Sequence, residues 1–107
     1  MDIYNFPDHT KGDTFKGRDI TLNFDITGAV IRMHFKSEGI DKVVFKWETT
    51  DNTFLVIDAL TGKFRMESRI LNFTPRRYIY DLEVTDSNGS VMTYLEGSIK
   101  ITQDITV

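Results

Sequence analysis

The feature that most constrains the fold of this chain is the alternation of apolar and polar residues with a period of two. Residues 20–26 alternate without a break, so that Ile20, Leu22, Phe24 and Ile26 share one face if the segment is extended. Successive side chains of a β-strand point to opposite faces, and a strand with one buried and one solvated face therefore shows this period. The segment predicts a strand.

The same period returns along the chain, and turn-forming residues separate the alternating runs. The runs contain many β-branched and aromatic residues, which strands favour, and they cover 29–35, 45–48, 54–57, 64–66, 78–84 and 99–101. The strongest hairpin signal is Asp86-Ser87-Asn88-Gly89, because Asn-Gly accepts positive φ angles. Glu96-Gly97 lies within the last long run and predicts a bulge or a bend. Only residues 67–73 leave room for one short helical turn.

These signals together predict an all-β chain. About eight or nine strands, spaced by roughly 8–12 residues, are typical of an antiparallel sandwich or barrel. The length of 107 residues fits one domain over residues 1–107. Residues 1–11 contain Pro7, which cannot donate a ladder hydrogen bond, and we expect them to form an arm or an edge strand.

Composition excludes several classes of protein. The chain has no cysteine, which removes disulfides, thiolate metal sites and cysteine nucleophiles. Its net charge is −3, and a nucleic-acid partner is therefore not expected. The first residues lack the basic start and apolar core of a signal peptide, and no apolar run approaches the roughly 20 residues of a membrane span.

The residues that could carry chemistry form no specific motif. His9 and His34 are the only histidines, and His34 lies on the polar side of an alternating run, where we expect it to be solvated. Asp8, His9 and Asp13 could in principle hold a metal, but their spacing matches no specific site, and a turn whose carboxylates bond nearby backbone amides explains the same residues. Residues 86–89 resemble the start of a calcium loop without its distal glutamate at the required spacing. We therefore expect no enzyme activity, no metal and no cofactor.

Two short segments are candidate partner interfaces. Tyr4 and Phe6 lie in the irregular N-terminal segment, beside Pro7. Such aromatic side chains could dock on a neighbouring subunit. The alternative is that they cover an open end of the domain's own core. Arg76 and Arg77 could meet an acidic patch on a partner, or could belong to a solvated turn. Trp47 is the expected centre of the core.

Several segments together resemble a known type of protein. They are KGDTF at 11–15, DITGAVI at 25–31, DALTGKF at 58–64, YIYDLEV at 78–84 and TYLEGSIKITQDIT at 93–106. In this order they are similar to small tailed-phage structural proteins and to the immunoglobulin-like N-terminal domain of phage baseplate upper proteins. The resemblance implies an immunoglobulin-like antiparallel β-sandwich that serves as an assembly module in a virion or prophage particle. It transfers no catalytic or ligand-binding residue.

The resemblance also implies partners and a location. The partners are other virion proteins or further copies of this chain, and the location is the virion, or the bacterial cytoplasm before assembly. No linker or receptor-binding region follows the last predicted strand, and we therefore expect a tail, baseplate or decoration adaptor. A soluble β-sandwich module that binds carbohydrate or a cell-surface ligand is the alternative, and a hydrolase is the third hypothesis.

Overall fold

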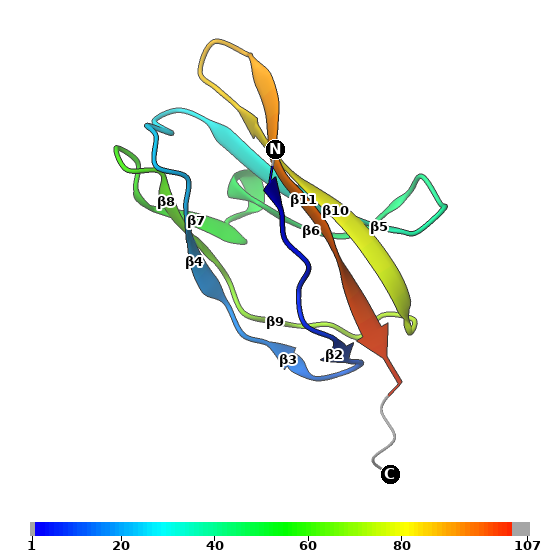
Figure 1. Ribbon diagram of the computed structural model, residues 1–107. Coiled ribbons are helices and arrows are strands. Elements are labelled where there is room, and N and C mark those ends of the chain that lie inside the picture. Colours follow the sequence, from blue (N-terminus) through cyan, green and yellow to red (C-terminus); the bar gives the residue numbers. More distant parts are fainter. Residues whose placement is uncertain (1, 104–107) are drawn as a thin grey trace.

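Two layers of β-strands face each other across the hydrophobic core in the computed structural model, which describes residues 2–103 (Figure 1). The main sheet has the order β1 (Asp2–Ile3), β11 (Val91–Thr102), β10 (Arg76–Thr85), β5 (Val30–Ser37) and β6 (Val43–Glu48), and β2 (His9–Thr10) also pairs with β11. The second layer contains β4 (Arg18–Thr21), β8 (Lys63–Met66) and β7 (Phe54–Asp58), with a short ladder of β3 (Thr14–Phe15) and β9 (Arg69–Ile70). The predicted all-β sandwich is confirmed.

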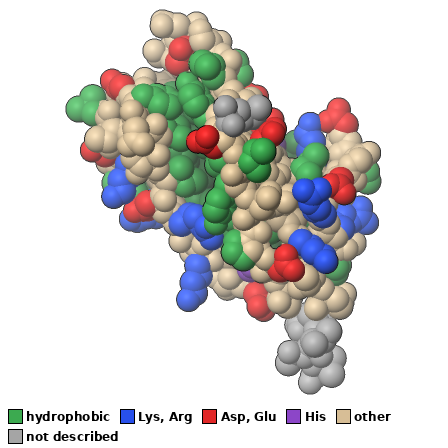
Figure 2. Space-filling view, viewed as in Figure 1, with side chains coloured by type: hydrophobic (Ala, Val, Ile, Leu, Met, Phe, Trp, Pro, Cys, Tyr) green, Lys and Arg blue, Asp and Glu red, His purple; other side chains and the backbone are tan. Residues whose placement is uncertain are grey.

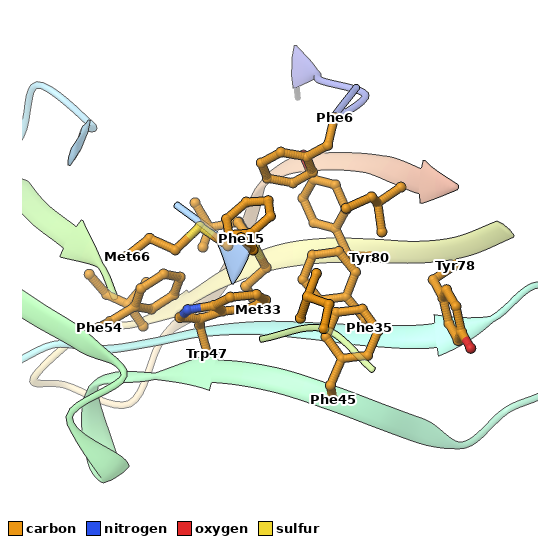
Figure 3. Packing of buried hydrophobic residues seen from close by; sticks show 14 of the residues in the cluster. Phe6, Phe15, Met33, Phe35, Phe45, Trp47, Phe54, Met66, Tyr78 and Tyr80 are labelled. Carbon is orange, nitrogen blue, oxygen red and sulfur yellow. The ribbon is translucent and has the colours of Figure 1, made fainter. Parts of the chain in front are cut away.

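The alternating runs bury the faces that their sequences predict. In β5 the side chains of Ile31, Met33 and Phe35 are buried, whereas the residues between them are only partly covered. Trp47 is fully buried, and its indole nitrogen donates a hydrogen bond of 2.9 Å to the carbonyl oxygen of Glu67. Figure 3 shows Trp47 among the aromatic and methionine side chains of both layers. The predicted central position of Trp47 is confirmed.

The strand predicted over residues 20–26 is shorter than its alternation suggested. β4 ends at Thr21, and Asn23 adopts a left-handed conformation with a φ of 64° that no regular strand contains. The Ala59–Gly62 turn packs closely here, because a Cβ on Gly62 would lie 2.5 Å from the carbonyl oxygen of Phe24. The side chains of Leu22, Phe24 and Ile26 nevertheless pack against the core, and the pattern was therefore right about burial and wrong about the strand.

The helical turn lies elsewhere than expected. Residues 67–73 contain the two-residue strand β9, whereas the only helical segment of residues 2–103 is the 3-10 turn η1 (Thr49–Asp51). It joins β6 to β7 and ends at Asn52, which is left-handed with a φ of 65°. This connection carries the chain from one layer to the other.

The predicted hairpin between β10 and β11 is present. Gly89 has a φ of 87°, and its N–H donates to the carbonyl oxygen of Asp86 over 3.0 Å. The carboxylate of Asp86 accepts hydrogen bonds from the backbone N–H groups of Asn88 and Ser90, each 2.9 Å long. Asn88 itself is not left-handed, and glycine alone supplies the positive φ that this turn requires.

The bulge expected at Gly97 lies three residues earlier. Gly97 pairs in register with Tyr80, whereas the register shifts between Leu82 and Glu83 and leaves Tyr94 as the extra residue of β11. Gly97 has a different role, because a Cβ at this position would overlap the carbonyl oxygen of Tyr4. The glycine allows the N-terminal segment to approach β11 closely.

Candidate functional site

The N-terminal segment is an edge strand of the main sheet. The N–H groups of Tyr4 and Phe6 donate to the carbonyl oxygens of Glu96 and Ser98, each over 2.8 Å, and β1 and β2 run parallel to β11. The hydroxyl of Tyr80 donates to the carbonyl oxygen of Tyr4 over 2.7 Å. Of the two readings of residues 1–11, the edge strand is the one observed for residues 2–11; Met1 lies outside the described residues.

The two aromatic candidates of this segment differ in position. Phe6 is 6% exposed and packs against Phe15, Phe35 and Tyr80 (Figure 3), where it covers the chain's own core. Tyr4 is 40% exposed, and its hydroxyl accepts a hydrogen bond of 3.0 Å from the guanidinium of Arg18. Only Tyr4 is accessible to a partner.

The two candidate arginines lie at the start of β10 and are both exposed. Arg76 donates to the hydroxyl of Ser37 over 2.9 Å, and Arg77 forms an ion pair with Glu38 in the turn after β5. Both belong to a regular strand rather than to a turn, and Arg77 lies opposite Lys100 in the ladder with β11. Arg77 therefore belongs to the outer face of the main sheet.

A groove of about 480 Å³ crosses this outer face. Its charged and polar lining consists of Asn5, His34, Lys36, Arg77, Asp81 and Glu96, and its apolar lining includes Ile3 and Ile79. Figure 2 shows acidic and basic side chains intermixed with hydrophobic ones on this side of the molecule. Of the four residues proposed from the sequence as interface residues, only Arg77 lines the groove; Tyr4, Phe6 and Arg76 do not.

The cationic side chains of the groove already have carboxylate partners. The ammonium of Lys36 lies 2.6 Å from Asp41, and this hydrogen bond, helped by the charges of Asp41 and Asp81, raises the pKa of Lys36. Arg77 pairs with Glu38. By contrast, neither Asp81 nor Glu96 has an ion pair within the described part of the chain. The groove thus offers two unneutralised carboxylates.

His34 is not the solvated residue that its alternation predicted. Its Nε2 atom donates to the Oε1 atom of Glu48 over 2.5 Å, and only 32% of its side chain is exposed. The register of β5 with β6 places Arg32 opposite Glu48 and His34 opposite Lys46, so that Glu48 lies diagonally across from His34 on the same face. The sequence alone places His34 on the polar face of its strand. It does not show which residues of β6 lie beside it, and the contact with Glu48 could therefore not be predicted.

Glu48 is the centre of an ionic network beside the groove. Its carboxylate accepts hydrogen bonds from His34, from Thr50 over 2.7 Å and from Lys46 over 3.2 Å, while Arg32 lies 3.7 Å away. Burial opposes ionisation, but these donors outweigh it and lower the pKa of Glu48 to about 2. Sequence reasoning missed this residue, because its only signal was a polar side chain at the end of a run.

The residues weighed as a metal site make other contacts. The imidazole of His9 donates to the carbonyl oxygen of Asp13 over 3.0 Å and packs near the ring of Phe15. Over residues 2–103, no three acidic or histidine side chains are placed to hold a metal ion together. A turn is present here, in which the N–H of Asp13 donates to the carbonyl oxygen of Thr10 over 3.1 Å.

A second, smaller hollow lies at the end of the sandwich that carries the β10–β11 hairpin. It has a volume of about 300 Å³, and its lining includes the loops around Asp25 and Asp86. The rings of Phe24 and Tyr94, whose centroids are 4.8 Å apart, form part of its apolar side. The carboxylates of Asp25 and Asp86 each accept backbone hydrogen bonds from their own loops.

Comparison with protein-family models finds no match for the chain, and a search of curated proteins finds none either. None of the helical structure in residues 2–103 is long and apolar enough to cross a membrane. The last residues of the C-terminal motif quoted above, Asp104–Thr106, lie outside the described residues.

Proposed function

We propose that the protein is a non-enzymatic structural or assembly protein of a phage or prophage virion, acting as a tail, baseplate or decoration adaptor. It works through protein–protein contacts made by the outer face of its main sheet. The observation that carries the proposal is the groove on this face. The order of turn and strand-end motifs that resembles phage structural proteins supplies the biological setting, in the virion or in the bacterial cytoplasm before assembly.

The groove has the mixed character of a surface that binds another protein reversibly. Ile3 and Ile79 are 70% and 39% exposed, and burying such side chains in a complex is favourable. Asp81 and Glu96 add acceptors without an ion-pair partner among residues 2–103. Protein interfaces combine apolar area with polar groups in this way. A partner that places basic side chains opposite Asp81 and Glu96 fits this face.

Neither imidazole is hydrogen-bonded to a serine or threonine hydroxyl within residues 2–103. Hydrolysis by a serine or threonine nucleophile requires a base that bonds the hydroxyl. The imidazole of His34 bonds Glu48, and that of His9 bonds a backbone carbonyl. The hydroxyl of Thr50, which belongs to the ionic network of Glu48, donates to Glu48 rather than to His34.

Quantitative mass spectrometry of density-purified particles tests the proposal. We expect the chain at a fixed copy number relative to the major capsid protein, and we expect Ile79→Asp to reduce its incorporation. Leu60→Asp is the matched control, because Leu60 is 73% exposed and lies in the β7–β8 turn, away from the groove. Absence of the chain from particles, with abundant protein in the lysate, would refute the proposal.

A module that binds carbohydrate or a cell-surface ligand is the second candidate, and the hollow beside Phe24 and Tyr94 favours it. Aromatic walls with a few polar groups are typical of small-ligand sites. The fully buried Trp47 cannot report such binding by direct contact. Glycan-array binding that disappears in Tyr94→Ala would support this candidate, whereas no binding would exclude it.

A further inference from the structure

We propose that the outer face of the main sheet pairs with the same face of a second copy of this chain, in a two-fold dimer with antiparallel strands. This inference names the partner of the protein-binding face and therefore rests on the proposed function. It follows from the charges along β10 and β11, where a basic pair and an acidic pair lie at equal distances on either side of the row that contains Ile79.

The β10–β11 ladder contains two like-charge pairs on its outer face. Arg77 lies opposite Lys100, and Asp81 lies opposite Glu96. All four residues are exposed. Like charges directly opposite each other destabilise a sheet, and local rules of this kind are often broken where a surface serves a function. Within residues 2–103, the attraction between Asp81 and Lys36 and the ion pair of Arg77 with Glu38 offset part of this repulsion.

The two pairs are placed symmetrically about one row of the ladder. Ile79 lies opposite Ser98, and each like-charge pair lies two residues to one side of this row. The basic and acidic pairs are therefore separated by four residues, or roughly 13 Å along the strands. A two-fold rotation about an axis that crosses the strands at Ile79 exchanges the basic and acidic positions.

This rotation makes β10 and β11 complementary to the same two strands of the second copy, while Lys36, which lies opposite Ile79 in β5, keeps Asp41 as its counter-ion. Arg77 and Lys100 of one copy meet Asp81 and Glu96 of the other copy, and the reverse contacts form at the same time, as in any isologous interface. Ile79 of each copy lies at the axis, where two exposed isoleucines bury each other. Ile3 lies opposite Glu96 in the ladder with β1 and extends the apolar area.

The existing contacts of these residues leave the dimer contacts available. Asp81, Glu96 and Lys100 have no ion pair within residues 2–103, although Lys36 is attracted by Asp81 while it hydrogen-bonds Asp41. Arg77 pairs with Glu38, but the two side chains are 52% and 55% exposed. Ion pairs so exposed contribute little and exchange readily. The long side chains of the second copy can then fill the groove.

Two charge-reversed variants, studied separately and as an equimolar mixture, test the proposal. One variant carries Arg77→Glu with Lys100→Glu, and the other carries Asp81→Lys with Glu96→Lys. Sedimentation equilibrium should show a wild-type dimer that weakens as the salt concentration rises, because screening acts on exposed charges. Each variant alone should associate at least about a hundredfold more weakly, and an equimolar mixture should restore a heterodimer.

The control variant carries Lys16→Glu with Lys42→Glu. It changes the net charge as the first variant does, at two exposed lysines of other segments, and it should dimerise like the wild type. Thermal melting of each variant establishes that it folds. A wild type that stays monomeric up to millimolar concentration would overturn the pairing, as would a dimer that survives both charge reversals.

The particle experiment separates this inference from the proposed function. A monomeric chain that is incorporated into particles at a fixed copy number would leave the assembly role intact and refute only the self-pairing. A dimer that is absent from particles would refute the assembly role in a virion and leave the self-pairing intact.

Discussion

Removing the charge of Glu48 should destabilise the fold in a pH-dependent manner. The residue is 7% exposed, and its carboxylate is held by His34, Lys46 and Thr50. Glu48→Gln keeps the size of the side chain but leaves these donors, with Arg32, around a neutral amide. The free energy of unfolding at pH 7 should therefore fall.

The magnitude follows from the pKa of Glu48, which lies at about 2 rather than at the ordinary value of 4.5. Each pKa unit corresponds to about 1.4 kcal/mol, and the shift sets an upper bound of about 3 kcal/mol. The side chains of Arg32 and Lys46 are 42% and 46% exposed, and solvent screens their contribution. We therefore expect a loss of about 2 kcal/mol.

The sign of the pH dependence follows from the direction of the shift. Because folding lowers the pKa of Glu48, its stabilising contribution is fully present above pH 4.5 and disappears as the pH falls towards 2. Urea unfolding of the wild type and of Glu48→Gln, between pH 7 and pH 2, measures this contribution directly. The two free energies should differ at pH 7 and converge near pH 2.

The comparison between the two proteins isolates Glu48 from other carboxylates, since hydrogen bonds also lower the pKa of Asp25 and of Asp51. Glu38→Gln is the matched control, because Glu38 pairs with Arg77 at an exposed position and its loss should cost less than about 1 kcal/mol. Parallel pH profiles for the wild type and Glu48→Gln would refute the reasoning.

Three further predictions concern the core and the turns. Trp47→Ala should lower the free energy of unfolding by about 3–5 kcal/mol in chemical denaturation, because the indole is fully buried; a near-wild-type value would contradict its central position. Gly97→Ala should release the N-terminal segment, since a Cβ overlaps the carbonyl oxygen of Tyr4, and chymotrypsin should then cleave near Tyr4 faster than in the wild type; equal rates would disprove this role. Gly89→Val should cost about 1–3 kcal/mol, seen as a lower melting temperature, because a β-branched residue tolerates a φ of 87° poorly; an unchanged melting temperature would count against the turn.

The alternation of residues was enough to predict the long strands and their buried faces. β5 and β10 bury every second residue, as their sequences indicate, because the core covers one face of each strand. The same reasoning failed at residues 22–26, where a turn packs against the chain. Leu22 and Phe24 still pack on the core, since an irregular segment can bury alternate side chains without ladder hydrogen bonds.

The candidate site was harder to predict, because it depends on which strands are neighbours. Asp81 and Glu96 are fifteen residues apart in the sequence and meet only through the register of β10 with β11. Glu48 and His34 meet through the register of β5 with β6. The sequence left open whether Phe6 docks on a neighbouring subunit or covers the chain's own core, and the parallel pairing of the N-terminal segment with β11 places its ring in the core.

Oxidative footprinting of the side chains tests the central claim, that the outer face of the main sheet is the contact surface, most directly. Hydroxyl-radical labelling, followed by residue-resolved mass spectrometry, would be compared between the isolated chain at high dilution and purified particles. We predict that Ile3 and Ile79 are protected in particles, whereas the labelling of Leu60 on the β7–β8 turn is unchanged. Equal labelling of Ile79 in both samples, with protection confined to Leu60 or other residues of the second layer, would contradict the claim.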